Sequence, residues 1–111
     1  MTFEFAQTVK SLQKRSFDPN ETMQWLTANR MTFWSWGVSK RVNFDNKALA
    51  LKVSARRWKG FVVITLGWDD IYIVSYMTQT GRIHKTFEGV YCDDLVEVID
   101  NEIENVPEYH Q

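Results

Sequence analysis

The sequence predicts an α+β fold: an antiparallel four- to five-stranded meander sheet with two short N-terminal helices and one amphipathic C-terminal helix. Apolar residues recur at helical spacing near both ends of the chain, and the period changes to two in between. Short turn sequences join the successive strand patterns, which favours pairing of strands in chain order. A length of 111 residues predicts a single domain, residues 1–111.

Two helices are predicted at the N-terminus. Residues 2–15 place three apolar side chains on one helical stripe, namely Phe5, Val9 and Leu12. Residues 16–30 contain a helix start, with Asp18 as N-cap, Pro19 at the first helical position and Glu21 completing a capping box. The sequence therefore predicts one short helix in each segment.

The first two strands are predicted from alternation. Residues 31–44 alternate apolar with small or polar side chains, which predicts a half-buried strand. Its apolar side would hold Trp34, Trp36, Val38, Val42 and Phe44. After a turn at Asp45 and Asn46, residues 47–55 resume the alternation and predict the second strand.

The remaining strands differ in their expected burial. Residues 60–68 are apolar on both sides, which predicts an inner strand covered on both faces. Residues 71–77 predict the next strand. Residues 82–88 predict a short last strand at the sheet edge, with Ile83 and Phe87 facing inward.

The C-terminal segment, residues 91–107, predicts an amphipathic helix that ends at Pro107. Its apolar stripe comprises Leu95, Val96, Ile99, Ile103 and Val106. A separate acidic stripe comprises Asp93, Glu97, Asp100 and Glu104. This acidic face is the first candidate binding surface.

Charge is divided along the chain although the net charge is −1. Residues 1–60 hold 11 of the 13 Lys and Arg but 4 of the 14 Asp and Glu, a net +7, and residues 61–111 therefore carry −8. In a meander, alternate turns lie at the same end of the sheet, so one end should be basic. The second candidate binding surface is this basic end, formed by Arg30, Arg56, Arg57, Trp58, Lys59 and Arg82.

The sequence contains few of the residue patterns that catalysis or metal binding requires. There are two histidines and one cysteine, Cys92, and no glycine-rich phosphate loop. His84 is expected on the outward side of the last strand, between the basic residues Arg82 and Lys85. We therefore expect no enzyme activity, no cofactor and no metal.

Two functions remain open. The leading hypothesis is a small non-catalytic binding module for a protein partner, of adaptor or inhibitor type, which would suit an accessory protein of a virus or mobile element. The alternative is single-stranded nucleic-acid binding, because residues 39–59 hold seven basic residues, a single acid and Trp58. A pI of about 6.1 argues against a dedicated nucleic-acid binder, whose pI is usually above about 9.

The expected location is cytoplasmic, without membrane contact. No stretch approaches the roughly 18 consecutive apolar residues of a membrane-spanning helix. The lone Cys92 cannot form an intrachain disulfide, which fits a reducing compartment. The aromatic content of 14%, with five tryptophans, is the most unusual feature of the composition. The oligomeric state is left open.

Overall fold

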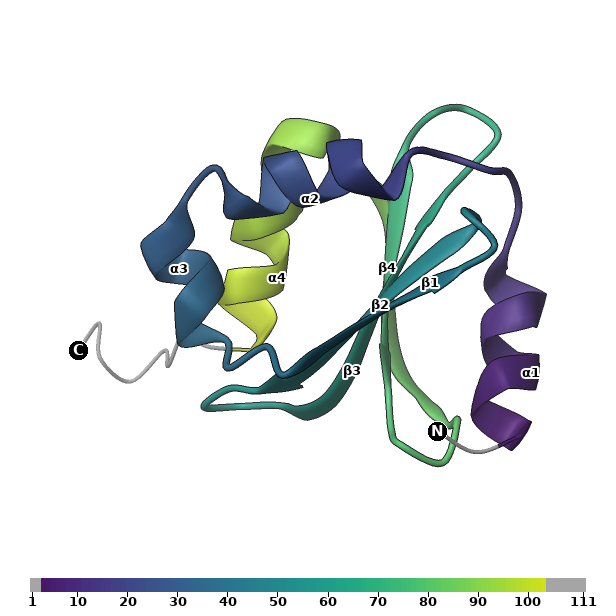
Figure 1. Cartoon of the computed structure of the whole chain (residues 1–111), viewed down its shortest axis with the longest axis horizontal. Coiled ribbons are helices and arrows are strands. Elements are labelled where there is room, and N and C mark those ends of the chain that lie inside the picture. Colours follow the sequence, from purple (N-terminus) through teal and green to yellow (C-terminus); the bar gives the residue numbers. More distant parts are fainter. Residues whose placement is uncertain (1–2, 104–111) are drawn as a thin grey trace.

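The computed structural model describes residues 3–103 and has an α+β architecture, as predicted. A five-stranded antiparallel sheet with strand order β1-β2-β3-β4-β5 separates α1 from a layer formed by the other helices (Figure 1). The helices are α1 (Phe3–Leu12), α2 (Pro19–Thr27), α3 (Arg30–Ser35), the 3₁₀ turn η1 (Cys92–Asp94) and α4 (Leu95–Ile103). The strands are β1 (Lys40–Phe44), β2 (Ala48–Ser54), β3 (Lys59–Leu66), β4 (Tyr72–Met77) and β5 (Ile83–Val90).

The sheet has an apolar core on each face. Alternate residues of β2, β3 and β4 pack under α2, α3 and α4 in the larger core, whose central residues include Leu51, Val62 and Tyr76. The intervening residues form a smaller core with α1, made of Phe5, Val9, Ala48, Ala50, Phe61, Val63 and Met77. Strand β3 is buried at every position after Lys59, which confirms the predicted inner strand.

Helix α1 is fixed against the sheet and against the β4–β5 turn. The Phe5 ring lies 4.5 Å from the Phe61 ring, centroid to centroid. The Thr8 hydroxyl donates to the Gly81 carbonyl at 2.9 Å. Gly81 has φ +97°, and a Cβ there would lie 2.7 Å from the Phe5 backbone nitrogen, so glycine permits both the turn and the close approach of α1.

The start of α2 confirms Asp18 as N-cap and Pro19 in the first turn, but among the described residues Glu21 does not complete the predicted capping box. Pro19 occupies the first turn, and the Asp18 carboxylate accepts a hydrogen bond from the Asn20 backbone N–H at 2.9 Å. The helix then buries Thr22 and Leu26 against the sheet, one turn apart. The Thr22 hydroxyl lies 2.8 Å from the Tyr72 hydroxyl of β4, which anchors α2 to the sheet.

The predicted strand over residues 31–44 is wrong in its first part, because residues 30–35 form α3 and β1 begins only at Lys40. The Asn29 side chain caps the helix by accepting from the Thr32 backbone N–H at 3.2 Å. Phe33 and Trp36, three residues apart, are both buried, whereas Trp34 is 70% exposed. The alternation of aromatic and polar residues fitted a strand, but the spacing of the two buried rings fits one helical turn.

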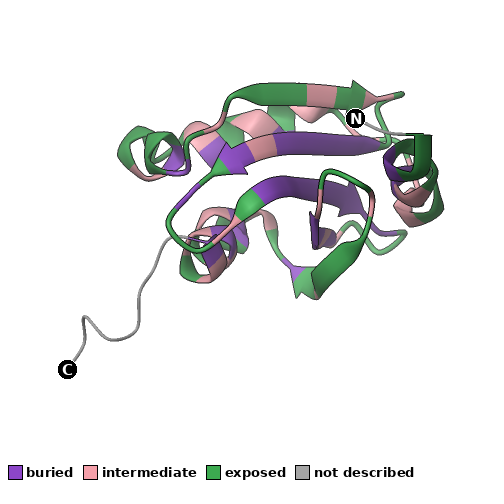
Figure 2. Cartoon of the chain, turned by 90° about the horizontal axis from the view of Figure 1, so that it is seen from below, coloured by how far each residue is buried: buried purple, intermediate pink, exposed green. Residues whose placement is uncertain are grey.

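The edge strands β1 and β5 are mostly exposed, whereas β2, β3 and β4 are mostly buried (Figure 2). The predicted edge position of the last strand is confirmed. Ile83 was expected inward but is 41% exposed, because the register of β5 shifts between the pairs Tyr76↔Lys85 and Met77↔Ile83. Phe87 does pack against the larger core.

Helix α4 buries Leu95, Ile99 and Ile103 of the predicted apolar stripe, and Val96 is half-buried. The predicted continuation through Val106 to Pro107, and the acidic residue Glu104, lie outside the described residues. Between Phe3 and Ile103, no helix has the length and apolar character needed to cross a membrane.

Candidate functional site

The β2–β3 loop, which carries Arg56, Arg57 and Trp58 and leads into Lys59 at the start of β3, is bound to the end of α4. The Arg57 backbone N–H donates to the Ile103 carbonyl at 2.8 Å. The Trp58 ring stacks on the His84 imidazole, with centroids 4.9 Å apart and planes 24° apart. Its indole N–H donates to the Phe61 carbonyl at 3.3 Å. One ring face of Trp58 is therefore already occupied within the protein.

The other two residues of the predicted basic end lie on different elements. Arg82 follows the β4–β5 turn, whose Gly81 contacts α1 on the opposite side of the sheet from α4 (Figure 1). Arg30 is the first residue of α3 in the helix layer. Arg82 directly precedes β5, whose His84 stacks on Trp58, whereas Arg30 comes from a separate helix.

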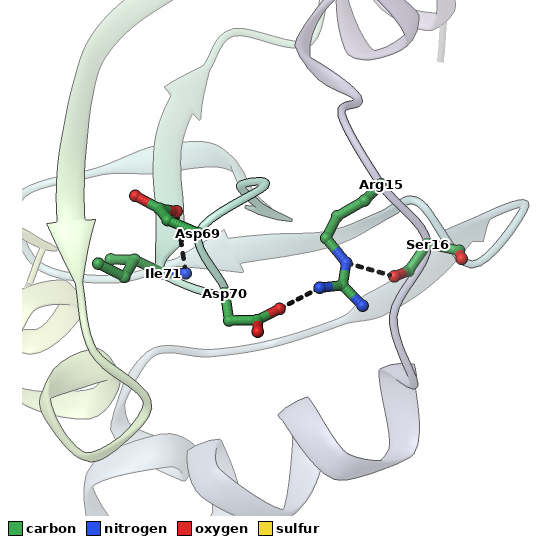
Figure 3. Close-up of polar contacts among 5 residues, drawn as sticks. All are labelled: Arg15, Ser16, Asp69, Asp70 and Ile71. Atoms are coloured by element: carbon green, nitrogen blue, oxygen red, sulfur yellow. Dashed lines mark hydrogen bonds and ion pairs between the residues drawn. The ribbon is translucent and has the colours of Figure 1, made fainter.

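The turn between β3 and β4, at the end of the sheet opposite the β2–β3 loop, is held by local bonds. Asp70 forms an ion pair with Arg15, which comes from the linker after α1 (Figure 3). The Asp69 side chain accepts from the Ile71 backbone N–H at 3.2 Å. These carboxylates stabilise the turn and attach it to the N-terminal segment.

A groove of about 480 Å³ lies between α2, the start of α3 and the η1–α4 segment. It contains three of the four acidic residues predicted as a binding face, Asp93, Glu97 and Asp100. Trp25 of α2, 38% exposed, forms an apolar part of its wall. The remaining lining residues are Ala28, Asn29, Thr32, Cys92, Val96 and Asn101. We call this the acidic groove.

The acidic groove has a negative charge without a basic counterpart. Its lining residues include no Lys or Arg. Within residues 3–103, none of its three carboxylates forms an ion pair. One oxygen of Asp100 accepts the indole N–H of buried Trp36 at 3.0 Å, which fixes that carboxylate relative to α3. Asp93 and Glu97 are exposed.

A second, smaller cavity of about 130 Å³ lies where the β2–β3 loop meets β5 and α4. Its lining residues are Arg57, Trp58, Tyr76, His84 and Glu102. Lys85 forms a 3.2 Å ion pair with Glu102. We call this the Tyr76 cavity.

Tyr76 is 1% exposed, and its hydroxyl has no hydrogen-bond partner among the residues that the structure describes. Burial, followed by the charge of Glu102, raises the pKa of this hydroxyl above its ordinary value. The hydroxyl is therefore neutral and retains its proton at physiological pH.

A cavity of about 680 Å³ lies between the α1–α2 linker and β1. It shares Met23 and Arg41 with a neighbouring cavity of about 500 Å³ beside α3. Its polar lining consists mainly of amide and hydroxyl side chains, with one acid, Asp18, and one base, Arg41. This balance gives no charge preference for a ligand.

Trp25, Tyr76 and Glu102 were not identified from the sequence as site residues. Tyr76 and Trp58 come together because β3 pairs with β4, so an assigned strand register would have indicated that contact. Trp25 lies next to Leu26 on α2, and its place in the groove depends on how α2 is oriented on the sheet, which the sequence does not show.

In the described part of the chain, no group of three His, Cys, Asp or Glu side chains is arranged to hold a metal ion.

Comparison of the chain with protein-family models, with curated proteins and with solved structures gives no match.

Proposed function

We propose that the chain is a non-catalytic protein-binding module and that the acidic groove binds a basic segment of a partner protein. The observation that supports this most directly is the meeting of Asp93, Glu97 and Asp100 with an exposed tryptophan, Trp25, in one groove. A concave surface with an aromatic wall and charge of one sign suits a peptide that carries an apolar anchor and Lys or Arg side chains.

The energetics assign different roles to the two kinds of groove residue. An aromatic side chain at the centre of an interface contributes much of the binding energy by burying apolar area. Exposed carboxylates contribute less to affinity, but they orient a basic partner and speed its encounter. Asp100, fixed by the indole of Trp36, is the best-positioned of the three.

Single-stranded nucleic-acid binding has weaker support. The loop Arg56 to Lys59 keeps its positive charge, but Trp58 has one ring face against His84 and its N–H on a backbone carbonyl. A stacking platform requires an accessible ring face.

The proposal is tested with synthetic 15-residue peptides that share one leucine anchor and differ in net charge. We expect the basic peptides to bind and to shift the backbone amide NMR signals of α2 and residues 92–101. The double variant Asp93→Lys, Glu97→Lys should weaken this binding roughly tenfold, since two charge reversals at exposed positions amount to about 1–2 kcal/mol.

The matched control is Glu4→Lys with Glu88→Lys, which makes the same change in net charge at exposed positions on α1 and β5. This variant should bind the basic peptides almost as well as the parent. An equal loss in both double variants would mean general charge attraction and would refute the groove. Binding that is independent of peptide charge would do the same.

A further inference from the structure

Strand β1 leaves one edge of the sheet open. It pairs with β2 on one side, and among the described residues no strand pairs with its other side. Every second residue of an edge strand directs its backbone N–H and C=O away from the sheet. Within residues 3–103, the backbone of Lys40 to Asn43 forms no hydrogen bond outside the β1–β2 pair. This edge can therefore accept another strand.

The opposite edge strand, β5, is less suited to accept a strand. Its pairing with β4 is irregular at two places, between Tyr72 and Val74 and between Tyr76 and Met77. Irregularities of this kind bend and twist an edge and so hinder its pairing with another chain. The pairing of β1 with β2 is regular over all its residues, from Lys40 to Phe44. Of the two edges, β1 is the better template.

Two neighbouring cavities form a groove along β1. Met23 of α2 and Arg41 of β1 line both cavities, so the two are continuous. The cavity beside α3, about 500 Å³, is also lined by Phe33 and Trp34. Trp34 is 70% exposed, so most of its apolar surface is uncovered. An apolar side chain of an added strand could bury part of this surface.

The charges at this edge favour an acidic occupant. Lys40 of β1 lies directly opposite Lys52 of β2, and like charges in opposite positions repel each other. Within residues 3–103, neither of these lysines nor Arg41 forms an ion pair. The cavity beside α3 has no Asp or Glu in its lining, and the acid of the other cavity, Asp18, caps α2. Carboxylates from a ligand would offset the repulsion.

These features distinguish an acidic peptide from two other occupants. A second copy of β1 would bring a further Lys40 and Arg41 to an edge that is already basic. A nucleic-acid strand would satisfy the charge, but its backbone cannot pair with the N–H and C=O groups of β1 in the manner of a strand. An extended acidic peptide satisfies both the charges and the backbone groups.

The geometry of a strand specifies the peptide further. Consecutive residues of an added strand face opposite sides of the sheet. Two adjacent acidic residues would therefore reach Lys40 on one face and Arg41 on the other. Apolar residues on either side of this acidic pair would lie near Trp34 and near the half-buried Val42.

We propose that β1 binds an extended acidic segment of a partner protein as an additional strand of the sheet. Backbone hydrogen bonds to the open edge hold the segment, and its carboxylates pair with Lys40 and Arg41. This surface shares no residue with the acidic groove, so each site can be tested without the other. The chain would then hold two protein segments of opposite charge.

The test is an NMR titration of the whole chain with a ten-residue peptide whose centre is Val-Glu-Glu-Val. We expect saturable shifts of the backbone amide signals of β1 and of the indole N–H signal of Trp34, which is identified by its loss in Trp34→Phe. The same peptide with Lys in place of Glu should not bind. Binding of both peptides alike, or of neither, would overturn the proposal.

The backbone part of the proposal is tested with two N-methylated forms of the acidic peptide, each methylated at every second residue. In an added strand, only one of these two sets of N–H groups faces β1. One form should therefore bind at least tenfold more weakly than the unmodified peptide, and the other should bind about as well. Equal behaviour of the two forms would refute strand addition.

The charge part is tested with the double variant Lys40→Glu, Arg41→Glu, which should weaken binding of the acidic peptide about tenfold or more. The matched control, Lys10→Glu with Arg82→Glu, makes the same change in net charge at exposed positions on α1 and before β5. An equal loss in both variants would mean general charge attraction and would overturn the proposal. Tighter binding of a single-stranded oligonucleotide to β1, or a dimer of the parent chain that the peptide dissociates, would overturn it in favour of those occupants.

Discussion

At the scale of single residues, two buried tyrosines of β4 illustrate different uses of the same side chain. Tyr72 joins β4 to α2 through a 2.8 Å bond with Thr22. Tyr76 has aromatic neighbours, Trp58 and Phe87, both in edge-to-face contact. Desolvation is the main cause that raises the pKa of each hydroxyl, so both remain neutral in the folded state at pH values where an exposed tyrosine ionises.

This difference predicts a loss of stability at alkaline pH. Above pH 10.0, the ordinary tyrosine pKa, the unfolded chain releases the Tyr76 proton while the folded chain keeps it. The unfolded state then binds fewer protons, so the free energy of unfolding falls as pH rises, by up to about 1.4 kcal/mol per pH unit for each such tyrosine. Urea unfolding between pH 8 and 11 should show a shallower decline for Tyr76→Phe than for the parent. Tyr91→Phe should match the parent, and an unchanged slope in Tyr76→Phe would contradict the assignment.

At the scale of elements, the sequence predicted most of the sheet and one helix too few. Strand β3 was predictable because its run of apolar residues admits burial on both faces, and α2 because its cap is local in sequence. Helix α3 was missed because alternating aromatic residues fit a strand equally well, and only tertiary packing selects the helix in which Phe33 and Trp36 share a face. Tertiary context also decided the bulge that exposes Ile83.

Helix α1 is the one helix of residues 3–103 on its side of the sheet, so its apolar contacts should carry much of its docking free energy. We expect Phe5→Ala to lower the free energy of unfolding by about 3–5 kcal/mol, since it removes a fully buried ring in contact with Phe61. Phe3→Ala, on the same helix but 75% exposed, should change it by less than about 0.5 kcal/mol. Denaturant unfolding followed by circular dichroism measures both. Similar losses in the two variants would contradict the packing of α1.

At the scale of the whole molecule, the strand order determines which connections lie at the same end of the sheet, and the helices determine what those connections contact. Chain order alone places the β2–β3 and β4–β5 connections at one end of the sheet, which is why the sequence suggested one basic end. The two connections nevertheless pack against different layers, one on α4 and the other on α1. Sequence could not predict these helix contacts, because they depend on which helices cover each face. Part of the acidic groove could be predicted from the sequence, because its carboxylates share one helix face. The contribution of Trp25 could not, because Trp25 lies on a different helix, α2.

The unequal cores predict an order of local stability across the molecule. Strand β3 is buried on both faces and bonded to a strand on each side, so its amides should exchange with solvent only through nearly complete unfolding. Helix α1 contributes two buried residues to the smaller core, so we expect it to detach while the larger core stays intact. Native-state hydrogen exchange should therefore show markedly weaker protection in α1 than in β3, and Phe5→Ala should accelerate exchange in α1 before it affects the centre of β3. Equal protection of the two elements would mean that the cores unfold together and would refute this order.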